Sequence, residues 1–150
     1  MTEVLRNIIR RNRNGERVAI VSVCSAHPDV LRASLAMAER LDRHIVIEAT
    51  SNQVNQYGGY TGMVPADYIG FINTIADEAG VTRERIVFGG DHLGPQAWRA
   101  LDGASAMAKA EAMIRDYVTA GFGKIHLDCS EGCAGEAPQL GDGLTAERSA

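Results

Sequence analysis

The sequence predicts an α/β fold in which parallel strands alternate with helices. Two observations support this prediction: short apolar runs alternate with longer segments of helical period, and polar side chains gather just after the runs. The runs are continuously apolar and rich in β-branched residues, which is typical of parallel strands covered on both faces. With right-handed connections, the carboxyl ends of such strands share one edge of the sheet, where binding sites form.

The expected elements follow in order along the chain. Thr2 can cap the first helix, Pro28 and Pro65 suit the first turns of the second and third, and Gly121 suits the end of the fourth. The predicted strands are residues 18–23, 45–49, 86–88 and 125–129. The predicted helices are residues 2–14, 28–41, 65–76 and 105–120, with a fifth beginning at 144. The apolar stripes that the middle three helices would bury are Val30, Leu31, Leu35, Ala38 and Leu41; Ile69, Ile72, Ile75 and Ala76; and Met107, Ala110, Met113, Ile114, Tyr117 and Val118.

The composition is that of one globular domain. The chain has 150 residues and a net charge of -4, which argues against general affinity for nucleic acid or an anionic membrane. No apolar run is long enough to span a bilayer, and residues 1–13 carry too many charges for a signal peptide. Three cysteines are an odd number, which argues against a secreted disulfide framework and favours the cytoplasm.

The pattern alone does not separate half of a (β/α)8 barrel from a small doubly wound sheet. A full barrel needs about 250 residues, and four strands would leave open edges. We expect the chain to be a fragment, because it stops within a helix that has no end signal. The alternative is closure by pairing with a second copy.

The segment 89–95, Gly-Gly-Asp-His-Leu-Gly-Pro, follows the third strand. Glycines at a strand end let a ligand approach the backbone, and Asp91 and His92 lie side by side there. A neutral imidazole can bind zinc, and a nearby carboxylate can move protons at a polarised carbonyl. In the alternative, Asp91 caps a turn and His92 is only hydrogen-bonded. The residues alone favour this alternative, since one histidine does not make a metal site.

Three further side chains are candidates for chemistry. His126 and Asp128 are two positions apart, so they share one face of the fourth strand. They could belong to a site or satisfy each other inside a polar core. Glu48 ends the second strand and needs a partner, because an unpaired buried charge is costly. It could bind a substrate or a metal, or pair with a basic side chain.

Two other segments allow a functional and a structural interpretation. The loop at residues 50–62 is dense in amides, hydroxyls and glycines, so it could cover a sugar phosphate or pack against a neighbouring subunit. Cys24 and His27 could form a nucleophilic pair. We expect instead that Cys24 is a small buried apolar side chain and that His27 only precedes a helix.

Five strings of the chain resemble the Z-type subunits of class II D-tagatose-1,6-bisphosphate aldolase. They are residues 24–28, 48–54, 57–63, 89–95 and 125–130, in the same order along nearly the whole chain. The resemblance implies a (β/α)8 barrel, with residues 1–150 as the N-terminal portion of a single domain and about its first four β/α units. It also implies a role in galactitol or amino-sugar breakdown, an oligomer and a catalytic class II aldolase subunit as partner.

The resemblance also suggests roles for individual residues. Class II aldolases carry Asp-His at a strand end, the histidine as zinc ligand and the aspartate as proton donor, and Asp91 and His92 look like that pair. The other zinc histidines of those enzymes come from later strands, so a Zn²⁺ site within this chain would be incomplete. The expected roles are proton transfer by Asp91 and Asp128, metal binding by His92, and substrate contacts from Glu48, Asn52, Gln53 and Ser130.

Three functions remain open at this point. The first is an accessory subunit of a class II aldolase complex, which we prefer. The second is a metal-dependent aldolase or epimerase that acts alone on a ketose or ketose phosphate. The third is a sugar-phosphate-binding module. Members of this family have also been labelled kinases. The residues do not support kinase activity, because the chain contains no Gly-x-x-x-x-Gly-Lys-Ser/Thr loop.

Overall fold

The computed structural model describes residues 2–150. Four parallel strands form one sheet in the order β1-β2-β3-β4, which confirms the predicted parallel α/β fold. The elements are α1 (Glu3–Arg13), β1 (Val21–Cys24), α2 (Pro28–Arg40), β2 (Ile45–Thr50), α3 (Pro65–Glu78), η1 (Arg83–Arg85), β3 (Ile86–Leu93), η2 (Pro95–Trp98), α4 (Gly103–Ala120), β4 (Lys124–Leu127) and α5 (Asp142–Ser149).

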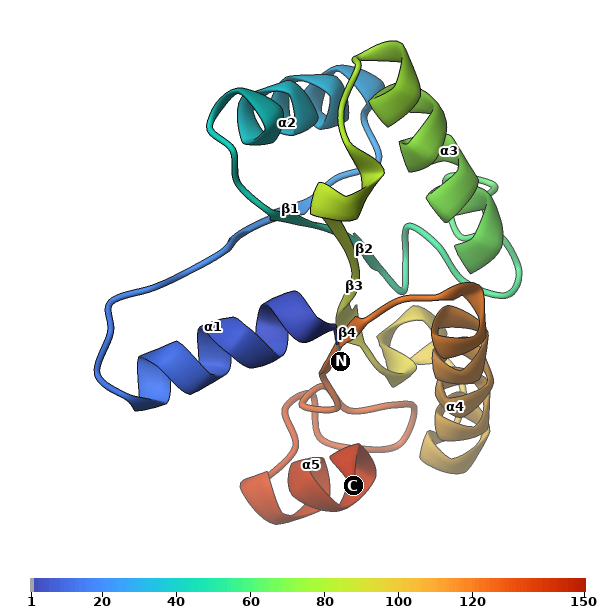
Figure 1. Ribbon diagram of the computed structural model, residues 1–150. Coiled ribbons are helices and arrows are strands. Elements are labelled where there is room, and N and C mark those ends of the chain that lie inside the picture. The colour runs from blue at the N-terminus through green and yellow to red at the C-terminus, as the bar shows by residue number, and fades with distance from the viewer. Residues whose placement is uncertain (1) are drawn as a thin grey trace.

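Helices cover the two sides of the sheet unequally (Figure 1). The helices α2, α3 and α4 lie along one side, α2 packing on α3 and α3 on α4. The helix α1 lies on the other side, near the amino ends of the strands (Figure 1). The side that faces away from α2, α3 and α4 is therefore open toward the carboxyl ends of the strands.

The main core lies between the sheet and these three helices. Alternate residues of β2, Ile45, Ile47 and Ala49, point into it, as the period of two in a strand requires. The buried helix residues are Leu31, Leu35 and Ala38 from α2, Pro65, Tyr68, Ile72, Ile75 and Ala76 from α3, and Ala106, Ala110, Met113 and Tyr117 from α4. The predicted stripes are thus largely confirmed, with Pro65, Tyr68 and Ala106 as additions.

Some apolar residues that the sequence places in the core are exposed. Val30, Leu41 and Val118 have exposed fractions of 45%, 56% and 57%, because they lie at the margins of their helical stripes. The prediction that the first strand is covered on both faces is wrong for Val21, which is 66% exposed. The reason is that β1 is an edge strand, with one neighbour instead of two.

Helix ends follow the predicted capping chemistry. The hydroxyl of Thr2 accepts a hydrogen bond from the amide of Leu5, and the left-handed Gly121 ends α4. Nδ1 of His27 accepts from the amide of Asp29 at the start of α2, which explains His27 without any chemical role. The strand bounds shift by a few residues from those predicted, most in β3, which continues to Leu93.

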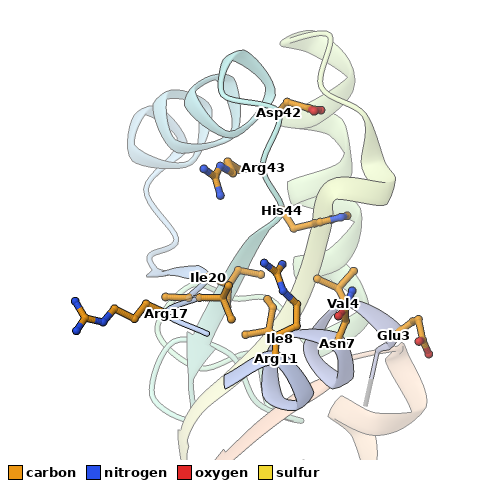
Figure 2. Close-up of a pocket in the computed structure, with 12 residues that line it drawn as sticks. Glu3, Val4, Asn7, Ile8, Arg11, Arg17, Ile20, Asp42, Arg43 and His44 are labelled. Atoms are coloured by element: carbon orange, nitrogen blue, oxygen red, sulfur yellow. The ribbon is translucent and has the colours of Figure 1, made fainter. Parts of the chain in front are cut away.

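A groove of about 470 Å³ separates α1 from the segments that lead into β1 and β2. Figure 2 shows Arg11 and Ile8 of α1 facing Ile20 and His44 across it. The groove lies at the amino ends of the strands, so it is distant from the polar strand ends. Within residues 2–150, no helix combines the length and apolar composition that crossing a bilayer requires.

Tyr68 connects this core to the carboxyl ends of the first two strands. Its side chain is fully buried, and its hydroxyl lies 2.7 Å from the carbonyl oxygen of Ser25 and 2.8 Å from that of Glu48. We expect Tyr68→Phe to lower the free energy of unfolding of the full-length protein by about 1–3 kcal/mol, because a buried carbonyl loses its donor.

Urea denaturation of wild type and variant measures this change. Tyr60→Phe is the matched control, since Tyr60 is 74% exposed. Equal midpoints for the two variants would show that the Tyr68 hydroxyl does not stabilise the fold.

Candidate metal centre at the carboxyl ends of the strands

The open side of the sheet carries polar residues in place of a core. Its members, each from a strand or the residue just beyond it, are Ser22, Cys24, Glu48, Asp91, His92, Lys124, His126 and Asp128. The pairing register aligns Cys24, Glu48, Gly89 and Lys124 in one row across the four strands. Thr50 and Asp91 follow in the next row toward the carboxyl ends.

An irregularity between β3 and β4 brings two neighbouring residues of β3 to this side. Gly90 pairs with Ile125 and Leu93 with Leu127, so Asp91 and His92 together stand opposite the single residue His126. Such a bulge redirects side chains that would otherwise point to opposite faces. His92 has a φ of 47°, in the left-handed region that costs a non-glycine residue about 1–3 kcal/mol. Backbone strain of this kind often accompanies a functional site.

The two histidines pair crosswise with carboxylates on the opposite strand. Nδ1 of His126 lies 2.8 Å from Oδ1 of Asp91, and Nδ1 of His92 lies 2.8 Å from Oδ2 of Asp128. The sequence left open whether His126 and Asp128 satisfy each other. They do not, because each contacts a residue of β3 instead. The imidazole rings of His92 and His126 are 4.6 Å apart between centroids.

These contacts suit a metal ion. One possible ligand atom from each of Asp91, His92 and His126 lies within 4.8 Å of the others. Metal-bound histidines usually donate the second ring nitrogen to a carboxylate, which fixes the tautomer and the direction of the ligating nitrogen. Both histidines have such a partner at Nδ1, which leaves both Nε2 atoms for an ion. The donor set of two imidazoles and a carboxylate is one that Zn²⁺ and similar divalent ions accept.

The charges around the cluster set its protonation. The hydrogen bond to Asp128 raises the pKa of His92, with the charge of Asp91 adding to the effect. The same bond, with two hydrogen bonds from Ser130, lowers the pKa of Asp128 to about 2. Burial tends to raise the pKa of Asp91, but His126, His92 and Lys124 together bring it below its usual range. Both aspartates are therefore ionised at neutral pH.

Glu48 is almost fully buried beneath this cluster, and it forms an ion pair with Lys124. One carboxylate oxygen accepts from the hydroxyl of Ser22, and the other contacts the ammonium group of Lys124. Nζ of Lys124 also lies 3.8 Å from Oδ1 of Asp91. Of the roles considered for Glu48 from the sequence, the structure shows the ion pair.

Two of the three other expected substrate residues have clear structural contacts through their side chains. Gln53 is buried, and its Oε1 accepts from the amide of Thr50 and the thiol of Cys24. Asn52 is exposed, and Ser130 donates both its hydroxyl and its amide to Oδ1 of Asp128. Asn52 is thus the member of this set whose side chain is free to meet a ligand from solvent.

The loop at residues 50–62 is folded onto itself. The side chain of Asn55 accepts from the amides of Tyr57 and Gly59 and donates to the carbonyl of Ser51. Gly59 has a φ of 55°, and a Cβ there would lie 2.4 Å from the carbonyl oxygen of Gln53. The loop therefore has a conformation held by its own hydrogen bonds, directly after the carboxyl end of β2.

Cys24 differs from its prediction. Its residue is exposed rather than buried, on the same side of the sheet as Glu48. Partial desolvation of the thiol, with the charges of Asp91 and Glu48, raises its pKa to about 11, so it remains a protonated thiol at neutral pH. Such a thiol is a poor nucleophile, which agrees with the expectation that Cys24 has no nucleophilic role.

Sequence reasoning did not single out Lys124, and it did not foresee the contact of His126 with Asp91. The spacing Lys124, His126, Asp128 places a charged or polar residue at every second position, which indicates one polar strand face. Apart from its glycines, no sequence pattern indicates the bulge in β3.

The comparisons with known proteins agree on one family. The family described as D-tagatose-1,6-bisphosphate aldolase subunit GatZ/KbaZ-like matches residues 5–150. The chain is 52% identical to the D-tagatose-1,6-bisphosphate aldolase subunit GatZ of Escherichia coli (strain K12) over 146 residues, 97% of this chain and 35% of that protein. It is 53% identical to the D-tagatose 6-phosphate 4-epimerase of Agrobacterium fabrum (strain C58 / ATCC 33970) over 150 residues, 100% of this chain and 35% of that protein.

A solved structure extends the likeness to the fold. The crystal structure of a probable tagatose 6 phosphate kinase from Sinorhizobium meliloti 1021 superposes with a TM-score of 0.85 and 55% identity, covering 88% of this chain and 34% of that one. The chain thus spans about a third of the length of these relatives. With the family description matching nearly all of its residues, the chain belongs to the GatZ/KbaZ-like family of D-tagatose-1,6-bisphosphate aldolase subunits.

Proposed function

We propose that this chain contributes a divalent-metal site, for Zn²⁺ or a similar ion, to a protein that acts on a phosphorylated ketohexose. The observation that carries this proposal is the cluster of Asp91, His92 and His126, in which each histidine is oriented by a carboxylate at Nδ1. An ion held there would polarise a ketose carbonyl, which is the assistance that aldol cleavage or epimerisation next to that carbonyl needs.

The two aspartates have different roles in this proposal. Both oxygens of Asp128 are engaged, by His92 and by Ser130, so Asp128 orients His92. Asp91 contacts His126 and Lys124 through Oδ1 and also bonds to the thiol of Cys24, and we assign it the proton transfer at a substrate hydroxyl. Because its pKa is lowered, Asp91 begins the reaction as a base. It takes a proton from the substrate and returns it after the bond change.

The substrate class comes from the relatives. The names of the three proteins above all refer to phosphorylated tagatose, as a substrate to be cleaved, epimerised or phosphorylated. The chain contains no Gly-x-x-x-x-Gly-Lys-Ser/Thr loop, so we assign it no kinase activity. The exposed side chain of Asn52 is the group of this chain that we assign to substrate hydroxyls.

We place residues 1–150 as about the first four β/α units of a single (β/α)8 barrel. The edge strands β1 and β4 support this placement, because they present unpaired backbone groups beside the exposed side chains of Val21 and Leu127. Further strands would cover these edges and close the polar side of the sheet into an interior. The three free cysteines suit a cytoplasmic protein.

An accessory role in an aldolase complex is the second candidate. The relative from Escherichia coli is named a subunit of D-tagatose-1,6-bisphosphate aldolase, which supports a catalytic partner and a hetero-oligomer. The orientation of both histidines by carboxylates favours the metal-dependent activity over a purely supporting role. In the supporting role, the cluster would hold an ion or a sugar phosphate without turning it over.

The activity is tested with the full-length protein on tagatose 1,6-bisphosphate and tagatose 6-phosphate. We expect turnover that EDTA removes and Zn²⁺ or another divalent ion restores. Asp91→Asn should lower turnover by about 10²- to 10⁴-fold, the usual contribution of a proton-transfer group. Asp116→Asn, on the exposed surface of α4, is the control. Turnover that resists EDTA, or an Asp91→Asn variant as active as its control, would refute the metal-dependent mechanism.

The supporting role is tested by mixing the full-length protein with a catalytic class II aldolase subunit. If this role holds, cleavage in the mixture exceeds that of the catalytic subunit alone, and the two proteins coelute on gel filtration. Separate elution with unchanged cleavage would remove this candidate.

The pairing of His92 with Asp128 predicts a pH dependence of the metal-free protein. The pKa of His92 is raised above its ordinary value of 6.5, so protonated His92 stabilises the fold fully below that pH. This contribution is lost as the pH rises through the raised pKa. In EDTA, the NMR titration of His92 should have its midpoint above 6.5, and Asp128→Asn should lower it. An unchanged midpoint in the variant would show that Asp128 does not hold His92.

A further inference from the structure

A gap at Gly89 lets two charged side chains meet across a whole strand. Glu48 on β2 and Lys124 on β4 both pair in register with Gly89 of β3, which lies between them. Strands are about 4.8 Å apart, so side chains two strands away from each other normally have a third side chain between them. A Cβ at position 89 would lie 2.7 Å from Oε1 of Glu48 and 2.9 Å from Cγ1 of Val46.

The space above Gly89 is therefore filled by the Glu48–Lys124 ion pair. The side chain of Glu48 is only 5% exposed and that of Lys124 is 29% exposed. Ser22 occupies the second carboxylate oxygen of Glu48, so the carboxylate has partners on both sides. A buried charge that is satisfied in this way has a fixed position, which makes it a suitable anchor for its partner.

The anchored ammonium group leads directly to the candidate metal ligands. Nζ of Lys124 lies 3.8 Å from Oδ1 of Asp91, the same oxygen that lies 2.8 Å from Nδ1 of His126. The order of contacts is thus Ser22, Glu48, Lys124, Asp91 and His126, from one edge strand to the other.

We propose that Lys124, anchored by Glu48 in the space that Gly89 leaves, is a positioning residue that holds Asp91 and through it directs His126 toward the metal ion. This inference rests on the proposed function. Partners of metal ligands commonly change metal affinity by about 10- to 100-fold when they are removed.

Gly89→Ala is the main test, because it changes no charged group. The added methyl group must displace the carboxylate of Glu48, and Lys124 moves with it. We expect the affinity of the full-length protein for Co²⁺ or Zn²⁺, measured by isothermal titration calorimetry, to fall by about 10- to 100-fold. Gly70→Ala is the matched control, since a Cβ at this position of α3 meets nothing within 4 Å.

A second variant covers the case in which Gly89→Ala does not fold. Glu48→Gln combined with Lys124→Met removes both charges together, so the net charge near the ion stays the same. We expect the same loss of affinity, and we expect this loss to disappear when Asp91 is already Asn, because Lys124 acts through Asp91. A loss that persists beside Asp91→Asn would overturn the positioning role, as would an affinity equal to that of Gly70→Ala.

The outcomes separate this inference from the proposed function. If wild type binds neither ion, or if His92→Ala binds as tightly as wild type, the proposed metal site fails and the positioning role fails with it. If His92→Ala abolishes binding while Gly89→Ala and the charge-neutral double variant bind normally, the metal site stands and the positioning role alone is wrong.

Discussion

The bulge between β3 and β4 is the constraint on which the site depends. In a regular strand, Asp91 and His92 would point to opposite faces, and one of them would enter the core beneath α3 and α4. Because two residues of β3 stand opposite His126 alone, both side chains reach the polar side. The left-handed backbone of His92 is the local cost of this geometry. His92 contacts Asp128, and His126 contacts Asp91. These two contacts link β3 to β4 and its next residue on both sides of the bulge.

The polar side of the sheet is organised in depth. Val46 and Val87 are buried nearest the amino ends, the Glu48–Lys124 pair lies above them, and the histidines are the most exposed layer. A buried ion pair adds little net stability, because desolvation of both charges offsets their attraction. Such a pair is better explained by the way it positions its side chains. Here the pair forms only because Gly89 has no side chain between the two charges.

The sequence predicted the parallel sheet, all five helices and most of the core, because the apolar periodicity of each element is strong. The predicted burial was wrong at the edges of elements. Val21 and Leu41 are exposed because no neighbouring element covers them, and a local sequence pattern does not say which elements are neighbours. In the candidate site, residue type and strand position singled out Asp91, His92 and Asp128 as candidates, and the family resemblance supplied the roles expected of them. The pairing was not predicted, since His126 contacts Asp91 only because of the bulge, and Lys124 reaches Glu48 only because position 89 has no side chain. Contacts between strands depend on register, which becomes visible only in three dimensions.

The stability that the charged cluster costs helps to decide between a catalytic role and a supporting role for this protein. Three carboxylates and one lysine occupy the side of the sheet that would face the interior of the barrel that we propose, and barrel interiors are usually filled with branched apolar residues. With both histidines neutral, the carboxylates of Glu48, Asp91 and Asp128 exceed the charge of Lys124 by two, which is the charge that a divalent ion would neutralise. A subunit that only supported a partner would fold more stably with an apolar interior, since each of these groups loses hydration on folding. Strained, charged and oriented residues that stability does not require are what a protein retains for chemistry, which supports the ion-dependent reaction that we propose for this centre.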